Sequence, residues 1–117
     1  MAEQSILKTI QRYLEMVHLA GIKVDRAVLF GSHARKEADP DSDIDILVIA
    51  PEFDEPYEKE RVDLLWELRV KSDSRIEPIP VGLRQWEEDD ASAIIEIARR
   101  EGQEIRMGEW ANGRILP

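Results

Sequence analysis

Two aspartates and a glycine–serine pair in this sequence are of the residue types that bind metal ions and phosphates. Asp43 and Asp45 are separated by one residue and lead into an apolar run, while Gly31 and Ser32 follow an earlier apolar run. Charged carboxylates are rarely buried without a compensating partner, so a strand that begins with two aspartates needs one. We expect that partner to be a divalent cation.

The spacing of the two aspartates suits a metal site. Residues two apart on a strand point to the same face, with backbones about 6.6–6.8 Å apart. Their carboxylates can converge on two metal ions roughly 3.5–4 Å apart, and Mg²⁺ usually takes one or two carboxylates plus substrate phosphates. The alternative to metal binding is that these aspartates form a turn. Turn formation explains Asp39, Asp41 and Ser42 in "DPDSD", but it leaves Asp45 unexplained inside the strand.

The glycine–serine pair predicts the phosphate-binding part of the same site. Gly31 permits a tight turn and the close approach of a phosphate. Ser32 is expected to open one or two helical turns whose free N–H groups favour an anion, although a serine there can also act only as a helix cap. Because the two motifs lie about a dozen residues apart on a strand–helix–strand, we interpret them as one nucleotide-binding site.

The elements that must position these residues alternate between helices and strands. Apolar spacing predicts helices over about 5–20, 56–71 and 91–101, and extended segments over 26–31, 43–50 and 75–81. This order predicts an α/β (α+β) fold, a small mixed sheet of about three or more strands with helices packed on it. Strand 43–50 has apolar residues on both of its faces, which places it in the centre of the sheet. Prolines confine 75–81 to an edge or a strand end.

Composition limits the class of protein further. The chain has 117 residues, no cysteine and a net charge of -9, which predicts one domain over 1–107 with a flexible tail over 108–117. The acidic surface disfavours bulk nucleic-acid binding and favours a basic protein partner. With no signal peptide or membrane span in the sequence, we expect a cytoplasmic protein, with homo-oligomer formation left open.

The stretch "GSHARKEADPDSDIDILV", residues 31–48, resembles the G-S-x-A-R…S-D-[IL]-D signature of the polymerase-beta-like nucleotidyltransferase superfamily. The short chain resembles the minimal nucleotidyltransferase (MNT) branch, many of whose members are encoded beside HEPN-domain toxins as antitoxins. The resemblance implies a Mg²⁺-dependent nucleotidyltransferase that moves AMP from ATP to a hydroxyl and releases pyrophosphate. It also implies a HEPN toxin as partner, modified on a tyrosine.

The resemblance assigns roles residue by residue. Asp43 and Asp45 match the catalytic metal ligands, and Gly31 and Ser32 match the triphosphate-binding turn. The third carboxylate of the family lies on the next strand, where Glu77 is the acidic residue, with Asp73 and Asp63 as distant rivals. The resemblance implies that this carboxylate is catalytic and helps activate the acceptor hydroxyl, as a general base or as a metal ligand. The family usually has Asp where this chain has Glu77, and usually Gly where it has Lys36.

Other residues carry alternatives. Arg35 and Ser42 of the motif are expected to bind nucleotide, although Arg35 is equally suited to pairing with an acidic neighbour. His33 is expected at the surface rather than as a metal ligand, and the acidic run 87–90 at a solvated helix start. Trp66 and Trp86 are expected in a core or an interface.

Two other functions remain beside the enzyme. The first is an antitoxin that neutralises its toxin by binding alone, with a vestigial active site. The second is a small-molecule modifier of the aminoglycoside type, which is less favoured because such enzymes usually carry an extra helical domain.

Overall fold

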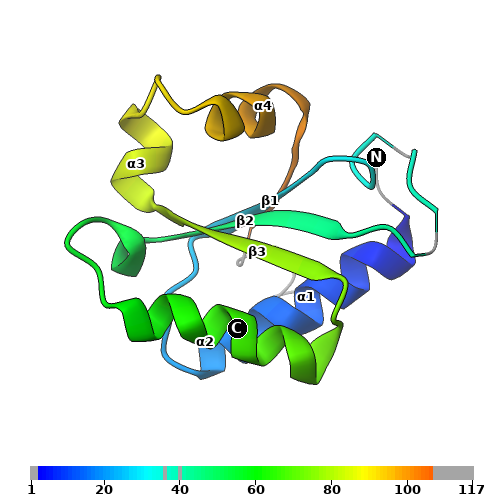
Figure 1. The fold of residues 1–117 in the computed structure, drawn as a ribbon, viewed down its shortest axis with the longest axis horizontal. Coiled ribbons are helices and arrows are strands. Elements are labelled where there is room, and N and C mark those ends of the chain that lie inside the picture. Colours follow the sequence, from blue (N-terminus) through cyan, green and yellow to red (C-terminus); the bar gives the residue numbers. More distant parts are fainter. Residues whose placement is uncertain (1–2, 36, 40, 107–117) are drawn as a thin grey trace.

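A mixed four-stranded sheet forms the centre of the computed structural model, which describes residues 3–35, 37–39 and 41–106 (Figure 1). The strand order is β3-β2-β1-β4, in which β1 pairs antiparallel with β2 and β4, and β2 pairs parallel with β3. The strands are β1 Arg26–Phe30, β2 Ile44–Ala50, β3 Ile76–Gly82 and β4 Gln103–Arg106. The predicted fold class is therefore confirmed, with β2 inside the sheet and β3 at an edge.

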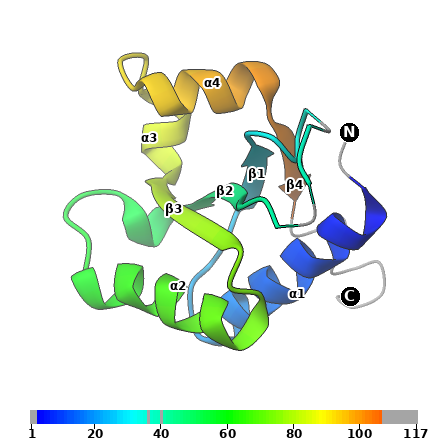
Figure 2. The ribbon, with the colours of Figure 1, turned by 45° about the vertical axis from the view of Figure 1, so that its right-hand side comes forward.

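Helices cover both faces of the sheet (Figures 1 and 2). The longer pair, α1 and α2, packs on one face, and the shorter pair, α3 and α4, packs on the other. A short 3-10 helix, η1, connects β2 to the segment before α2. The bounds are α1 Gln4–Leu19, η1 Pro51–Phe53, α2 Lys59–Ser72, α3 Leu83–Glu88 and α4 Ala93–Glu101.

Strand β2 is buried on both of its faces. Ile44, Ile46 and Val48 belong to the core under α1 and α2, whereas Leu47 and Ile49 belong to the core under α3 and α4. Because side chains alternate along a strand, Asp45 falls on the face of the sheet that α3 and α4 cover. The candidate site therefore opens on the side of the sheet with the shorter helices.

The C-terminal third of the domain differs from the prediction. The acidic run 87–90 does not begin a helix: it ends α3 and enters the loop before α4. There Oδ1 of Asp89 accepts hydrogen bonds from the backbone N–H groups of Ala91 (2.8 Å) and Ser92 (2.9 Å), and Ser92 caps α4. An acidic side chain that turns the backbone in this way interrupts a helix. The predicted helix over 91–101 corresponds to α4, and α3 is a separate helix that the sequence pattern did not predict.

Strand β4 was not predicted. It is four residues long and buries only Ile105, too short a pattern to identify from sequence. Its pairing with β1 places β1 inside the sheet. The predicted tail, 108–117, lies outside the described residues. Within the described part, no helix has the length and apolarity needed to cross a bilayer.

Candidate active site

The turn after β1 lies directly against Asp45. Gly31 has a positive φ of 76°, and a Cβ added to it would be 2.6 Å from Oδ2 of Asp45. The antiparallel register of β1 and β2 causes this approach, since it pairs Phe30 with Asp45. A residue with a side chain would therefore be strained in its backbone and crowded by the carboxylate. The two motifs that the sequence suggested as one site do meet in space.

Three carboxylates belong to this end of the sheet. Asp45 is half-buried and opposite Glu77 in the parallel register of β2 and β3, and Asp43 is exposed just before β2 begins. The pKa of Asp45 is raised, first by its partial burial and then by repulsion from Asp43 and Glu77, while His33 opposes the shift. A site that repels its own negative charge is one that a cation would stabilise.

The donor set fits a divalent ion held by two aspartates. Among the described residues, no three His, Cys, Asp or Glu side chains are gathered closely enough to hold an ion together. Mg²⁺ nevertheless commonly uses one or two carboxylates and takes its other ligands from water and substrate phosphates. Asp43 and Asp45 supply that number of carboxylates, and metal binding by Asp43, Asp45 and Glu77 stays a prediction.

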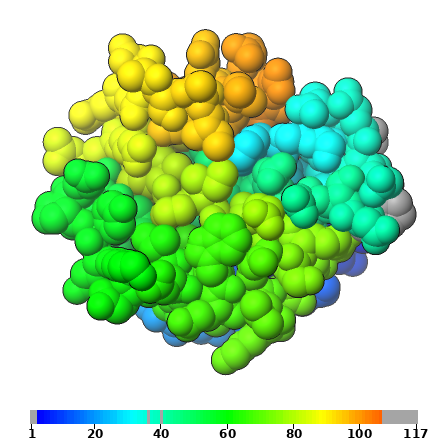
Figure 3. Space-filling model, viewed as in Figure 1, coloured from blue at the N-terminus to red at the C-terminus, as the bar shows by residue number. Residues whose placement is uncertain are grey.

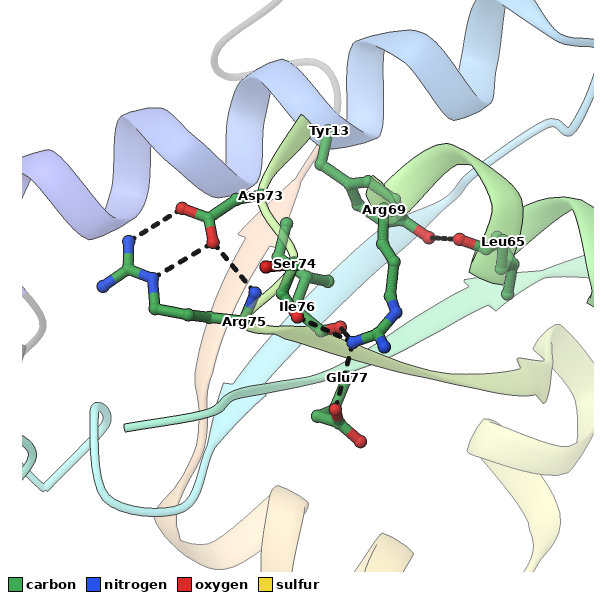
Figure 4. Close-up of polar contacts among 8 residues, drawn as sticks. All are labelled: Tyr13, Leu65, Arg69, Asp73, Ser74, Arg75, Ile76 and Glu77. Carbon is green, nitrogen blue, oxygen red and sulfur yellow. Dashed lines mark hydrogen bonds and ion pairs between the residues drawn. The ribbon is translucent and has the colours of Figure 1, made fainter. Parts of the chain in front are cut away.

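The carboxylate of Glu77 is paired with an arginine that the sequence did not single out. Oε2 of Glu77 lies 3.1 Å from Nη1 of Arg69, which is on α2 (Figure 4). The two rival carboxylates have other partners: Asp73 pairs with Arg75 at 2.8 Å, and Asp63 pairs with Lys59 at 2.9 Å. Of the three, Glu77 is the one opposite Asp45.

Residues 32–35 form a turn and not the predicted helix start. The backbone N–H groups of Ala34 and Arg35 donate to the carbonyl of Gly31 at 3.1 and 3.3 Å, and Glu37 donates to the carbonyl of Ser32 at 2.9 Å. These bonds close about one turn, so there is no helix dipole at this point. Phosphate binding by Ser32 stays a prediction that rests on the tight turn at Gly31.

His33 is buried, which corrects its predicted surface position. It is 8% exposed, and its Nε2 lies 3.2 Å from the carbonyl oxygen of Ser42. The hydroxyl of Ser42 accepts from the backbone N–H of Asp39 at 3.1 Å and lies 3.2 Å from Oδ1 of Asp39. His33 and Ser42 thus connect the turn to the loop before β2, and nucleotide binding by Ser42 stays a prediction.

Arg35 pairs with acidic neighbours, one of the two roles that the sequence left open. Its Nε lies 2.9 Å from Glu37, and its Nη1 lies 3.6 Å from Glu101 at the end of α4. In Figure 3 the cyan segment after β1 borders the orange end of α4 on the surface. Phosphate binding by Arg35 stays a prediction, and its side chain is 43% exposed.

A concavity of about 740 Å³ lies at the other end of β2 and β3, away from the candidate site. Its lining includes one guanidinium, that of Arg84, and five carboxylates, those of Asp54, Glu55, Glu88, Asp89 and Asp90. Such a concentration of negative charge repels a triphosphate. This hollow is therefore a poor candidate for the triphosphate, and nucleotide binding at the turn after β1 stays a prediction.

Comparisons with known proteins identify the family of this chain. The profile of the nucleotidyltransferase domain family matches residues 8–104. Since the match covers most of the sequence, the chain belongs to the nucleotidyltransferase domain family, as its resemblance implied. A Methanocaldococcus jannaschii protein, MJ0141, whose name proposes a protein adenylyltransferase, is 38% identical over 58 residues. That match spans 49% of this chain and 59% of the relative.

Two solved structures share the fold. A proposed nucleotidyltransferase from Sulfolobus solfataricus has a TM-score of 0.57 and 22% identity, with 71% of this chain and 72% of that chain covered. A toxin–antitoxin structure with AMP-PNP has a TM-score of 0.51 and 24% identity, with 80% and 70% covered. At these identities the likeness establishes the architecture.

Proposed function

We propose that this nucleotidyltransferase domain transfers AMP from ATP to a hydroxyl group on a partner protein. The observation that carries the proposal is the close approach of the Gly31 turn to Asp45, since the residues proposed to bind phosphate and metal then lie at one point. The raised pKa of Asp45 supports it, because a cluster of carboxylates that repel one another is suited to a cation. The name of MJ0141 supports the same class of reaction, and the AMP-PNP in the toxin–antitoxin structure supports a nucleoside triphosphate as the substrate.

The reaction forms one bond and breaks one bond. The acceptor oxygen bonds to the α-phosphorus of ATP, and the bond from that phosphorus to the bridging oxygen of the β-phosphate breaks. The leaving pyrophosphate keeps that bridging oxygen. The acceptor's proton goes to Glu77, whose carboxylate acts as general base. The turn at Gly31 and Ser32 would bind the triphosphate and set its direction relative to the acceptor.

Asp43 and Asp45 would hold Mg²⁺. When bound, the ion supplies positive charge that offsets the negative charge of the triphosphate. The chain's own residues then have the remaining tasks of orienting the two reactants and accepting the proton.

The acceptor is proposed to be a tyrosine on a HEPN-type toxin. The net charge of -9 favours a basic protein over a nucleic acid as the molecule that brings the hydroxyl. The partner would supply the second half of the site.

The experiment is a transfer assay with ATP labelled at the α- or the γ-phosphate, Mg²⁺ and the product of the neighbouring gene. We expect the α-label on the partner and the γ-label in pyrophosphate. The Asp43→Ala/Asp45→Ala variant should lose the transfer, and Asp63→Asn, an exposed carboxylate on α2, should keep it. Label from γ-ATP on the partner would indicate a kinase and would contradict the proposal.

A second candidate function is an antitoxin that acts by binding alone. The pairing of Glu77 with Arg69 favours it, because this carboxylate has a partner other than a metal or an acceptor. Full neutralisation of the toxin in cells by the Asp43→Ala/Asp45→Ala variant, with no label on the partner, would support this function over the first.

A further inference from the structure

Arg69 reaches Glu77 around the open edge of the sheet. Glu77 shares a face with Asp45, whereas Arg69 belongs to α2, which packs on the opposite face. β3 is an edge strand of the sheet (Figure 1), and a side chain from α2 can therefore extend past it (Figure 4). An edge strand also presents unpaired carbonyl groups on its outer side. These two properties of the edge allow an arginine on one face to bind a carboxylate on the other.

The Arg69 side chain is fixed in place by several contacts. Its Nη1 donates to the carbonyl oxygens of Ser74 (2.7 Å) and Ile76 (2.9 Å) as well as to Oε2 of Glu77 (3.1 Å). The guanidinium carbon lies 5.0 Å from the centre of the Trp66 ring, one helical turn earlier. The side chain is 25% exposed. A guanidinium held by the backbone and by an aromatic ring gives Glu77 a partner at a defined position.

We infer that Arg69 is a positioning residue that holds Glu77 at the edge of the sheet, apart from the ion site of Asp43 and Asp45. This inference rests on the proposed function and refines it. It makes Glu77 the proton acceptor for the attacking hydroxyl and leaves the two aspartates as the ion-binding pair. It also explains why no three carboxylates among the described residues gather around one point. Without the guanidinium of Arg69 beside it, Glu77 would be free to turn toward the metal ion.

Ion binding tests this inference without any need for catalysis. Mn²⁺ prefers the same oxygen ligands as Mg²⁺ and can be measured by calorimetry or by electron paramagnetic resonance. Glu77→Gln should leave the Mn²⁺ affinity within about threefold of the wild type, since the loss of a nearby charge is screened by water. A loss of tenfold or more would make Glu77 an ion ligand and would overturn the inference.

Arg69→Gln should have the opposite effect. Releasing Glu77 and removing a positive charge should raise the Mn²⁺ affinity several-fold, on the order of tenfold. The increase should be smaller in Arg69→Gln/Glu77→Gln, because no third carboxylate is then available. Arg61→Gln is the matched control, since Arg61 lies on the same helix and pairs with the exposed Glu58. An unchanged or lower Mn²⁺ affinity in a folded Arg69→Gln protein would overturn the inference. If Arg69→Gln does not fold, the Mn²⁺ affinity of Glu77→Gln decides whether the inference holds.

The transfer rate supplies a second, independent readout. Glu77→Gln should lower kcat on the order of 100-fold with little change in KM for ATP, as for the loss of a general base. Arg69→Gln should also lower kcat. Adding Arg69→Gln to Glu77→Gln should lower kcat hardly further, because the effects of residues that act through one another are not additive. Arg69→Lys, which keeps the charge, should restore part of the rate. Additive losses would assign Arg69 a structural role only. A wild type that transfers nothing would defeat the proposed function and leave the Mn²⁺ results to decide on Arg69.

Discussion

The carboxylate of Asp45 occupies the space into which a side chain on Gly31 would project, 2.6 Å from an added Cβ. The glycine is therefore required twice, once for its positive φ and once for this contact. Gly21 also has a positive φ, 105°, but nothing lies within 4 Å of its added Cβ. Comparing substitutions at Gly31 and Gly21 therefore separates the free-energy cost of backbone strain from the effect of disturbing the site.

We expect Gly31→Ala and Gly21→Ala each to lower the free energy of unfolding by about 1–2 kcal/mol, because alanine disfavours a left-handed backbone. Gly31→Ala alone should also weaken the binding of Mg²⁺–ATP, since Asp45 must move. Urea denaturation and calorimetric titration measure the two effects. Wild-type nucleotide binding by Gly31→Ala would show that the turn is not part of the site.

Asp45→Asn should stabilise the protein when no divalent ion is present. The raised pKa of Asp45 means that its ionised form is less favourable in the folded protein than in the unfolded chain. At any pH above that raised pKa, the charge therefore reduces stability, and an amide removes this loss. Asp63→Asn is the control on an exposed helix surface.

Adding Mg²⁺ should make the wild type more stable than Asp45→Asn, the reverse of the order expected without the ion. The ion binds the folded wild type and raises its melting temperature, whereas Asp45→Asn should respond much less. Thermal unfolding with and without Mg²⁺ measures this. An Asp45→Asn protein that is less stable than the wild type without Mg²⁺ would show that the carboxylate has a favourable partner of its own.

Tyr13 should make the protein sensitive to alkali. Its side chain is fully buried, its hydroxyl donates to the carbonyl of Leu65 at 2.7 Å, and burial raises its pKa well above the usual value. Because the unfolded tyrosine loses its proton at about pH 10 and the folded one does not, stability should fall as the pH rises above 10. Tyr13→Phe should show a shallower fall, and Tyr57→Phe, at a half-exposed position, should resemble the wild type.

Tyr13→Phe should also change the stability of the protein at neutral pH. Tyr13→Phe should cost about 1 kcal/mol of stability, the usual contribution of one hydrogen bond. Urea denaturation between pH 7 and 11 measures both effects. Equal pH dependence in Tyr13→Phe and the wild type would contradict the buried position of this hydroxyl.

Asp54 caps a helix from a distant part of the chain. Its carboxylate accepts from the backbone N–H groups of Arg84 (3.0 Å) and Gln85 (3.2 Å) at the start of α3, where the N-cap residue is Gly82. Asp54→Ala should therefore cost about 1 kcal/mol of stability, as for the loss of an N-cap. Asp90→Ala, at an exposed position in the next loop, is the control. Equal stability of the two variants by urea denaturation would contradict this role of Asp54.

Much of the site could be predicted because its components lie within one short stretch. Gly31, Asp43 and Asp45 are local in sequence, and strand alternation then determines which aspartates share a face. The position of β2 also followed from its composition, since apolar residues at both parities require cover on both sides. Glu77 was a weaker prediction, because its approach to Asp45 depends on the parallel register of two strands separated by a helix.

Arg69, His33 and the strand β4 show where sequence reasoning ended. A basic residue in the last turn of a helix is favoured by the helix dipole, so Arg69 gives no sign in the sequence of its contact with Glu77. His33 was expected at the surface, and its burial was not predicted because its partner is a backbone carbonyl, which no sequence pattern reveals. Strand β4 is short, and its pairing with β1 depends on where α4 ends.

The order of residues by itself determined the alternating elements, the central strand and the local motif of glycine and aspartates, since these depend on backbone preference and on the period of apolar side chains. The tertiary structure decided which charges meet. It placed Glu77 opposite Asp45, brought Arg69 around the sheet edge and buried His33, because such contacts depend on strand order, register and the direction of side chains that are far apart along the chain.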